Sequence, residues 1–144
     1  MRVSELMHTP VVTCRPDATI AEVARLMRDR NVGSVVVVDQ VSYLAGIVTD
    51  RDVAVRGVGE GRSGDLEVEQ IMSRNVATVL LHADVSDAAG IMVKRSVRRL
   101  PVVDEDDRAH GMVALDDLVR HLGREADAVA DTVMLQAANL SNRP

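Results

Sequence analysis

The chain has 144 residues, 47% of them hydrophobic and 27% charged, which excludes a disordered protein, and no uncharged apolar run is long enough to span a membrane. Its net charge of −5 and its single aromatic residue, a tyrosine, disfavour nucleic acid as a partner, because neither phosphates nor bases find a matching surface. One cysteine and an N-terminus without a hydrophobic signal stretch predict a cytoplasmic protein without internal disulfides.

The first half of the chain predicts a helical turn followed by a β-α-β-β-α succession. Thr19 and Glu22 have the spacing of a capping box, and the apolar residues after them recur every three or four positions. The unbroken run of valines after Ser34 is typical of a strand buried on both faces. In chain order, the predicted elements are a helical turn at Val3–Met7, a strand at Val11–Cys14, a helix at Ile20–Arg30, a strand at Ser34–Val38, a strand at Tyr43–Thr49 and a helix at Asp50–Arg56.

The second half repeats the first without a gap when the sequence is shifted by 65 residues. Gly46 then falls on Gly111, and Asp52 falls on Asp117. Two copies of this length indicate a duplicated module whose halves cover each other's apolar faces with pseudo-twofold symmetry. The predicted elements of the second copy are a helical turn at Val68–Met72, a strand at Val76–Leu80, a helix at Val85–Arg95, a strand at Arg99–Val103, a strand at His110–Ala114 and a helix at Leu115–Leu122.

These elements predict an α/β (α+β) fold of two β-α-β-β-α modules. The first spans residues 1–58 and the second residues 67–122, and a linker rich in glycine and charge joins them at residues 59–66. Residues 123–144 have no counterpart in the repeat, and from Glu125 to Leu140 they predict an amphipathic helix. This helix either packs against its own pair of modules or forms a surface for a partner or a second chain.

The strongest chemical signal is the segment Gly46–Asp52. A glycine within a strand permits close approach of another backbone or a ligand. Thr49 ends the strand, and the start of the next helix offers free N–H groups that suit a phosphate. The Asp52 carboxylate can accept hydrogen bonds from the vicinal hydroxyls of a ribose. In the alternative interpretation, Thr49 and Asp50 only cap the helix, and Asp52 only lies favourably near its dipole.

Together with the duplication and the segment Val97–Asp104, this pattern resembles the CBS domain, the cystathionine-β-synthase-type module, over both halves of the chain. The resemblance implies a tandem pair, or Bateman module, stacked through its sheets, with adenosine-containing ligands bound in clefts between the halves. It assigns the phosphate contact to Thr49 and the ribose contact to Asp52. It also places the threonines of the first strand of each copy, Thr13 and Thr78, in the same kind of cleft.

The second copy departs from this pattern. It has Ala114 where the first copy has Thr49, so one phosphate contact is lost, whereas Asp117 keeps the ribose role. A lost neutral hydrogen bond costs only about 0.5–1.5 kcal/mol, which weakens the second cleft without excluding it. We therefore expect the cleft that holds Thr49 and Asp52 to be the better site.

Two arginines distinguish the copies. Arg98 and Arg99 precede the buried strand of the second copy, where the first copy has a glycine and a serine. Because pseudo-symmetry brings the halves face to face, these side chains could reach a phosphate held by the other half. Arg51, which is next to Asp52 in the sequence, could contact the phosphate in the same way. In the alternative interpretation, the pair is solvated or forms salt bridges with acids such as those at residues 104–107.

Other candidate groups are weaker. The four histidines lack the spacing of metal ligands, and no base lies near a nucleophile in the sequence, so we expect neither a metal site nor an enzyme. Cys14 lies in an apolar strand and is predicted to be a buried structural thiol.

The predicted function is that of a stand-alone regulatory module. It would bind an adenosine-containing ligand such as AMP, ADP or ATP between its halves and signal through altered packing or association. The expected partners are this adenine nucleotide, a second copy of the chain in a homodimer, and a protein effector of unknown identity; membranes and nucleic acids are not expected. The alternative is a CBS-pair interaction protein that dimerises without binding a nucleotide.

Overall fold

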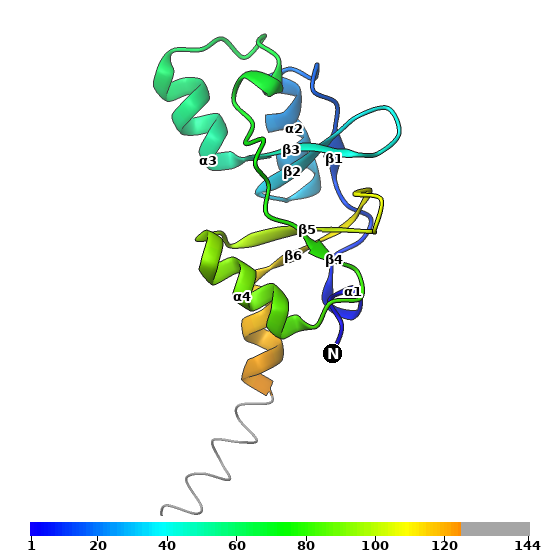
Figure 1. The fold of residues 1–144 in the computed structure, drawn as a ribbon. Coiled ribbons are helices and arrows are strands. Elements are labelled where there is room, and N and C mark those ends of the chain that lie inside the picture. The colour runs from blue at the N-terminus through cyan, green and yellow to red at the C-terminus, as the bar shows by residue number, and fades with distance from the viewer. Residues whose placement is uncertain (125–144) are drawn as a thin grey trace, which may run out of the picture.

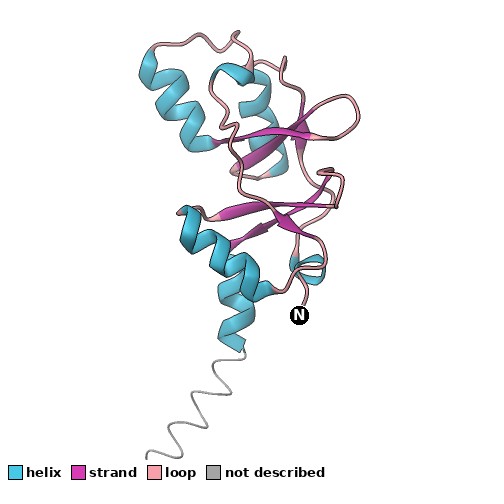
Figure 2. Ribbon diagram, in the orientation of Figure 1, coloured by secondary structure: helices cyan, strands magenta, loops and turns pink. Residues whose placement is uncertain are grey.

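Two modules of the same topology stack on each other, as Figure 1 shows. A computed structural model describes residues 1–124, so the amphipathic helix expected between Glu125 and Leu140 lies outside the described residues. The two three-stranded sheets lie in the middle of the molecule, and the longer helices cover their outer sides (Figure 2). The predicted pair of α/β modules is confirmed.

The central strand of the first module is buried along its whole length. Its sheet has the order β1-β2-β3, with β1 parallel to β2 and β2 antiparallel to β3, and all five residues of β2 are buried. The capping box forms as predicted: the Thr19 hydroxyl accepts from the Glu22 amide, and the Glu22 carboxylate accepts from the Thr19 amide. The elements are β1 (Thr13–Cys14), α2 (Ile20–Arg30), β2 (Ser34–Val38), β3 (Leu44–Thr49) and α3 (Asp50–Asp52).

The second module repeats this arrangement closely. Val102 pairs with Gly111 in its sheet as Val37 pairs with Gly46 in the first, and both sheets have a register shift one residue later. Its long helix ends at Ser96, which adopts the left-handed conformation that Asn31 adopts in the first module, with the same φ of 52°. The elements are β4 (Val79–Leu80), α4 (Val85–Arg95), β5 (Arg99–Val103), β6 (Ala109–Ala114) and a helix that begins at residue 115.

The two modules exchange their first helical turns. The turn that starts the first repeat, α1 (Val3–Leu6), lies beside the second module in Figure 1, and Val3 is fully buried in that module's core. The turn that starts the second repeat, η3 (Val68–Gln70), is bound by the first module, and Val68 is fully buried there. Backbone hydrogen bonds fix both turns: Val3 donates to Ala83 at 2.9 Å, and Val68 donates to Ala18 at 2.7 Å. Each core is therefore completed by the other repeat.

The observed elements differ from the predicted ones at the module edges. Only the last two residues of each predicted first strand pair in a sheet, because the residues before them turn away to face the other module. The helix predicted at Asp50–Arg56 continues through a π-helical turn, η1 (Val53–Gly57), and a 3-10 turn, η2 (Val58–Glu60). It ends at Gly61, whose φ of 69° suits glycine, so part of the predicted linker is helical.

The hairpin loops of the two sheets touch at the side away from the helices that follow β3 and β6. The Leu44 amide donates to the Asp107 carbonyl at 3.1 Å, and the Arg108 guanidinium lies 5.5 Å from the centre of the Tyr43 ring. In the second loop, hydrogen bonds to Asp104 from the His110 ring and from the amides of Arg108 and Asp106 hold the pKa of this carboxyl below its usual range. These contacts join the sheets at one edge.

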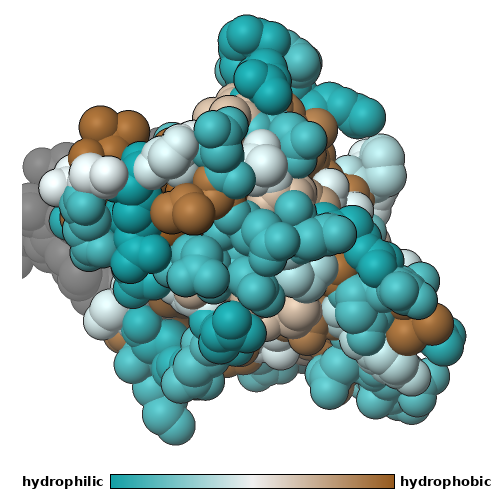
Figure 3. All heavy atoms as spheres, turned by 90° about the horizontal axis from the view of Figure 1, so that it is seen from above, coloured by the Kyte–Doolittle hydropathy of each residue, from teal (hydrophilic) through white to brown (hydrophobic). Residues whose placement is uncertain are grey.

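Apolar side chains gather in two cores, one on the outer face of each sheet. The face of the molecule seen in Figure 3 is mostly hydrophilic, with small separate apolar groups. Among residues 1–124, no helix has both the length and the apolar content needed to cross a membrane.

Candidate functional site

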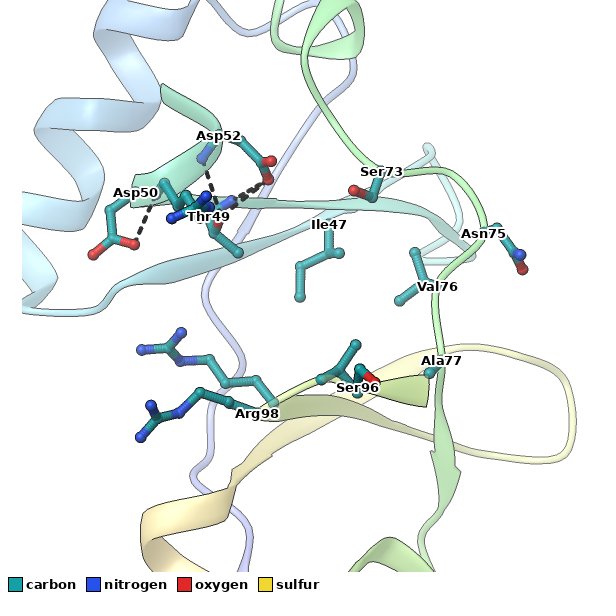
Figure 4. Close-up of a pocket in the computed structure, with 13 residues that line it drawn as sticks. Ile47, Thr49, Asp50, Asp52, Ser73, Asn75, Val76, Ala77, Ser96 and Arg98 are labelled. Atoms are coloured by element: carbon teal, nitrogen blue, oxygen red, sulfur yellow. Dashed lines mark hydrogen bonds between the residues drawn. The ribbon is translucent and has the colours of Figure 1, made fainter. Parts of the chain in front are cut away.

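A cavity of about 390 Å³ opens between the modules where β3 ends (Figure 4). It lies at the point where three segments from different parts of the chain meet. Residues 8–12 and 73–77 are equivalent crossing segments, each of which pairs with a strand of the other repeat at its first residue. The cavity is lined by Ile47 and residues 49–52 of the first module, by Ser73 and residues 75–77 of one crossing segment, and by residues 96–99 of the second module. The structure thus brings Thr49, Arg51, Asp52, Arg98 and Arg99 into one cavity.

Thr49 and Asp52 form a compact unit on one wall of this cavity. The Asp52 Oδ2 atom accepts hydrogen bonds from the Thr49 amide at 2.9 Å and from the Thr49 hydroxyl at 3.1 Å, and the same hydroxyl accepts from the Asp52 amide. Thr49 therefore caps the helix, as the alternative interpretation held, and still lines the cavity. The Asp52 Oδ1 atom has a looser contact, with Arg56 Nε at 3.8 Å, which leaves this oxygen able to accept hydrogen bonds from a ligand.

The two arginines approach the cavity from the opposite module. Figure 4 shows Arg98 extending below Thr49 and Asp50. Arg98 is mostly exposed and lies 3.6 Å from Asp116, whereas Arg99 is half-buried. A Cβ atom at Gly33 would lie 3.0 Å from Arg99 Nη2 and 3.1 Å from Asp50 Oδ2, so the Arg99 guanidinium lies against the first module. The cavity thus has a carboxylate oxygen on one wall and a cationic group on the other.

A second cavity of about 290 Å³ occupies the pseudo-symmetric position. It is lined by His8, residues 10–12 and residues 31–34 of the first half, and by Arg99, Met112 and Ala114 of the second. Arg99 therefore lines both cavities. Asp117, unlike Asp52, is not among the residues that line its cavity. Its carboxylate accepts from the Ala114 amide at 3.0 Å and contacts His8 Nε2 at 3.0 Å, so both of its oxygens are engaged.

A family model for the CBS domain matches residues 3–58 and, a second time, residues 68–124. The chain belongs to the CBS domain family. A CBS domain-containing protein of Bacillus subtilis, YhcV, is 39% identical over 131 residues, which cover 90% of this chain and 92% of the relative. Inosine-5'-monophosphate dehydrogenase of Mycobacterium leprae is 33% identical, but the match covers only 21% of that enzyme.

Solved CBS domain pairs have the same fold. The pair of protein MJ0100, in complex with 5'-methylthioadenosine and S-adenosyl-L-methionine, is 29% identical with a TM-score of 0.79, over 87% of this chain and 98% of that one. The CBS domain protein PAE2072 of Pyrobaculum aerophilum, complexed with AMP, is 28% identical with a TM-score of 0.76, over 81% and 89% of the two chains.

The strand-one threonines of the CBS modules lie beside the cavities and not in their lining. In the described part of the chain, neither Thr13 nor Thr78 is among the residues that line the two cavities. Thr13 is the first residue of β1, and Thr78 directly precedes β4. The residues just before these threonines line the cavities: Val11 and Val12 in one case and residues 75–77 in the other. The chain reaches each cavity before the first strand begins, which moves the lining residues toward the N-terminus.

Several lining residues of the first cavity were not predicted from the sequence. Ser73 and Asn75 come from the crossing segment, and Ser96 from the end of α4. The repeat relates Ser96 to Asn31, which has the same left-handed backbone conformation and lines the other cavity. Ser73 carried no comparable signal, because its position depends on the exchange of the helical turns.

Cys14 and the histidines add no further site to the CBS modules. Burial raises the pKa of the Cys14 thiol to about 11, which keeps it protonated at neutral pH. Within residues 1–124, no three His, Cys, Asp or Glu side chains gather as they would around a metal ion.

Proposed function

We propose that this CBS pair is a regulatory module that binds an adenine nucleotide, such as AMP, ADP or ATP, in the cavity that holds Thr49 and Asp52. The observation that carries the proposal is the pairing of Asp52 Oδ1 on one wall with the Arg99 guanidinium on the other. A carboxylate oxygen suits ribose hydroxyls, and a forked guanidinium suits a phosphate. The cavity volume of about 390 Å³ lies within the range of roughly 300–1,000 Å³ typical of small-molecule sites.

The bound states of similar CBS pairs support this ligand class. One similar pair is complexed with 5'-methylthioadenosine and S-adenosyl-L-methionine, and another with AMP. Adenosine is common to all three molecules. The phosphate requires a cation in the site, and Arg99 supplies one in this chain.

The proposed mechanism is a change in packing between the modules. A nucleotide held by Asp52 and Arg99 touches both modules at once, so it stabilises the arrangement in which both contacts are made. We propose that a second copy of the chain and a protein effector respond to this arrangement. Exposed valines and leucines on α4 and on the helix after β6, among them Val93 and Leu122, support association with a second copy.

Thermal denaturation with a panel of ligands tests the proposal. AMP, ADP, ATP, NAD and S-adenosylmethionine are each added to the whole chain, and a ligand at 100 times its Kd should stabilise the fold by about 2.7 kcal/mol. Asp52→Ala should abolish most of the shift, whereas Asp117→Ala, the matched control in the other repeat, should leave it largely intact. If no ligand of the panel shifts the transition, the protein is instead an interaction module without a nucleotide; if Asp117→Ala is the more damaging change, the ligand occupies the other cavity.

A further inference from the structure

Besides Ala114 and the two arginines, the two cavities also differ at a pair of equivalent positions, His8 and Ser73. Both residues lie where a crossing segment passes over a strand of the other module, and both are fixed by two backbone hydrogen bonds. His8 exchanges them with Met112 at 2.8 and 3.1 Å, and Ser73 exchanges them with Ile47 at 2.9 and 3.0 Å. The repeat therefore places the two side chains at equivalent positions. Each lines the cavity beside the strand with which its backbone pairs.

The two side chains reach different distances. From its fixed backbone, the His8 ring spans to Asp117 and places Nε2 3.0 Å from Oδ1. The other oxygen of Asp117 accepts from the Ala114 amide, so both carboxylate oxygens are engaged. Ser73 is too short to do the same, and within residues 1–124 it forms no hydrogen bond with Asp52. The oxygen that a ribose would need is thus occupied in one repeat and accessible in the other.

We propose that His8 closes the second cavity to nucleotides by occupying Asp117, so that each chain binds one nucleotide, in the first cavity. This inference rests on the proposed function, because it assigns the ribose contact to the equivalent aspartates. A ribose that uses Asp117 must first displace the imidazole, which holds one of its two carboxylate oxygens at 3.0 Å. It also finds a methyl group at Ala114 where the first cavity has the Thr49 hydroxyl.

Arg99 strengthens the difference between the cavities. Its guanidinium lines both of them, so a phosphate bound beside Thr49 and Asp50 holds Arg99 on that side. The second cavity then has no other arginine among its lining residues in the described chain. Occupation of the first cavity and the His8 contact therefore act in the same direction.

Reciprocal exchange of the two residues tests the inference, with AMP as the probe and isothermal titration as the measurement. The unmodified chain should bind one AMP. His8→Ser should free the Asp117 oxygen and add a second AMP per chain, with an affinity for the second cavity raised roughly ten-fold or more. Ser73→His should place an imidazole against Asp52 and weaken AMP binding in the first cavity by a similar factor. His8→Ser combined with Asp117→Ala should lose the second AMP again.

The outcomes separate this inference from the proposed function. Two equivalent AMP sites in the unmodified chain, or no gain of a site in His8→Ser over the unmodified chain, would overturn the role of His8. If the unmodified chain binds no AMP while His8→Ser binds one, the proposed function is wrong and the role of His8 stands. If neither protein binds AMP, both are wrong. Thermal denaturation of each variant checks that it is folded, and the His8 replacement is expected to cost little stability because this side chain is 72% exposed.

Discussion

Ser73 crosses over Gly46 so closely that only a glycine fits beneath it. A Cβ atom at Gly46 would lie 2.8 Å from the Ser73 carbonyl oxygen and 2.7 Å from Met72 Sδ. In the other repeat, a Cβ atom at Gly111 would lie 2.9 Å from the His8 carbonyl oxygen. Because the backbone oxygens are fixed by the sheet-like hydrogen bonds of the crossing segments, Gly46→Ala and Gly111→Ala should each destabilise the fold by about 1–3 kcal/mol in urea denaturation.

Gly90 is the matched control for these two substitutions. It lies exposed within α4, and a Cβ atom there would meet nothing within 4 Å. Gly90→Ala should therefore stabilise the protein by about 0.5–1 kcal/mol, as expected for a helix interior. Equal effects at all three glycines would mean that the crossing segments are not packed as described.

The exchanged helical turns predict an effect at a distance in the sequence. Val3→Ala should remove about 2 kcal/mol of stability and, in hydrogen exchange, loosen the second module, although Val3 belongs to the first repeat. Val68→Ala should act on the first module in the same way. Val93→Ala, which alters an 81% exposed side chain, should change the stability by less than about 0.5 kcal/mol. Loosening of the first module by Val3→Ala would contradict the exchange.

Arg99 is expected to recognise the phosphate rather than the nucleoside. Its replacement by alanine should weaken AMP binding by roughly 10- to 100-fold, the range for a hydrogen bond to a charged group, and leave adenosine binding nearly unchanged. Arg98→Ala is the neighbouring control and should cost less, because Arg98 is 74% exposed and already lies near Asp116. Titrations of both ligands with both variants measure this. An equal loss for AMP and adenosine would assign Arg99 a structural role.

The Cys14 thiol predicts a pH dependence of both reactivity and stability. Burial raises its pKa from 9.0 to about 11, so labelling by a disulfide reagent at pH 8 should be about 100-fold slower in the folded chain than in the denatured one. Because the raised pKa belongs to the folded state, this contribution to stability is fully present below pH 9 and is lost as the pH rises toward 11. Cys14→Ala should lack that part of the loss, as urea titrations at pH 8 and pH 10.5 would show. Rapid labelling of the native protein at pH 8 would contradict it.

Local signals predicted the regular elements well. The helix bounds Ile20–Arg30 and Val85–Arg95 match the structure, because a cap fixes each start and a left-handed residue fixes each end. Both central strands also match, since their continuous apolar runs are typical of strands buried on both faces. These features depend on residues close together in the chain.

The features that were missed depend on residues far apart in the chain. The exchange of helical turns cannot be predicted from the repeat, because the equivalent positions 3 and 68 are both valine and either side chain fits either core. The contact of His8 with Asp117 spans 109 positions and follows from that exchange. The site was predicted where one segment carries several polar groups, as in Thr49–Asp52, and missed where the crossing chain contributes, as at Ser73.

The reciprocal insertion of α1 and η3 also sets the order of events during synthesis. When the ribosome has made the first sixty residues, the segment containing Val68 and Ile71 does not yet exist, so the core beneath β2 still lacks part of its filling. The earliest residues, Val3 among them, must wait longer still, until β6 has been made. The first half therefore cannot close its core until Met72 of the second repeat has been made, and the second half, which takes Val3 from the first repeat, closes its core later still, once Leu118 has been made.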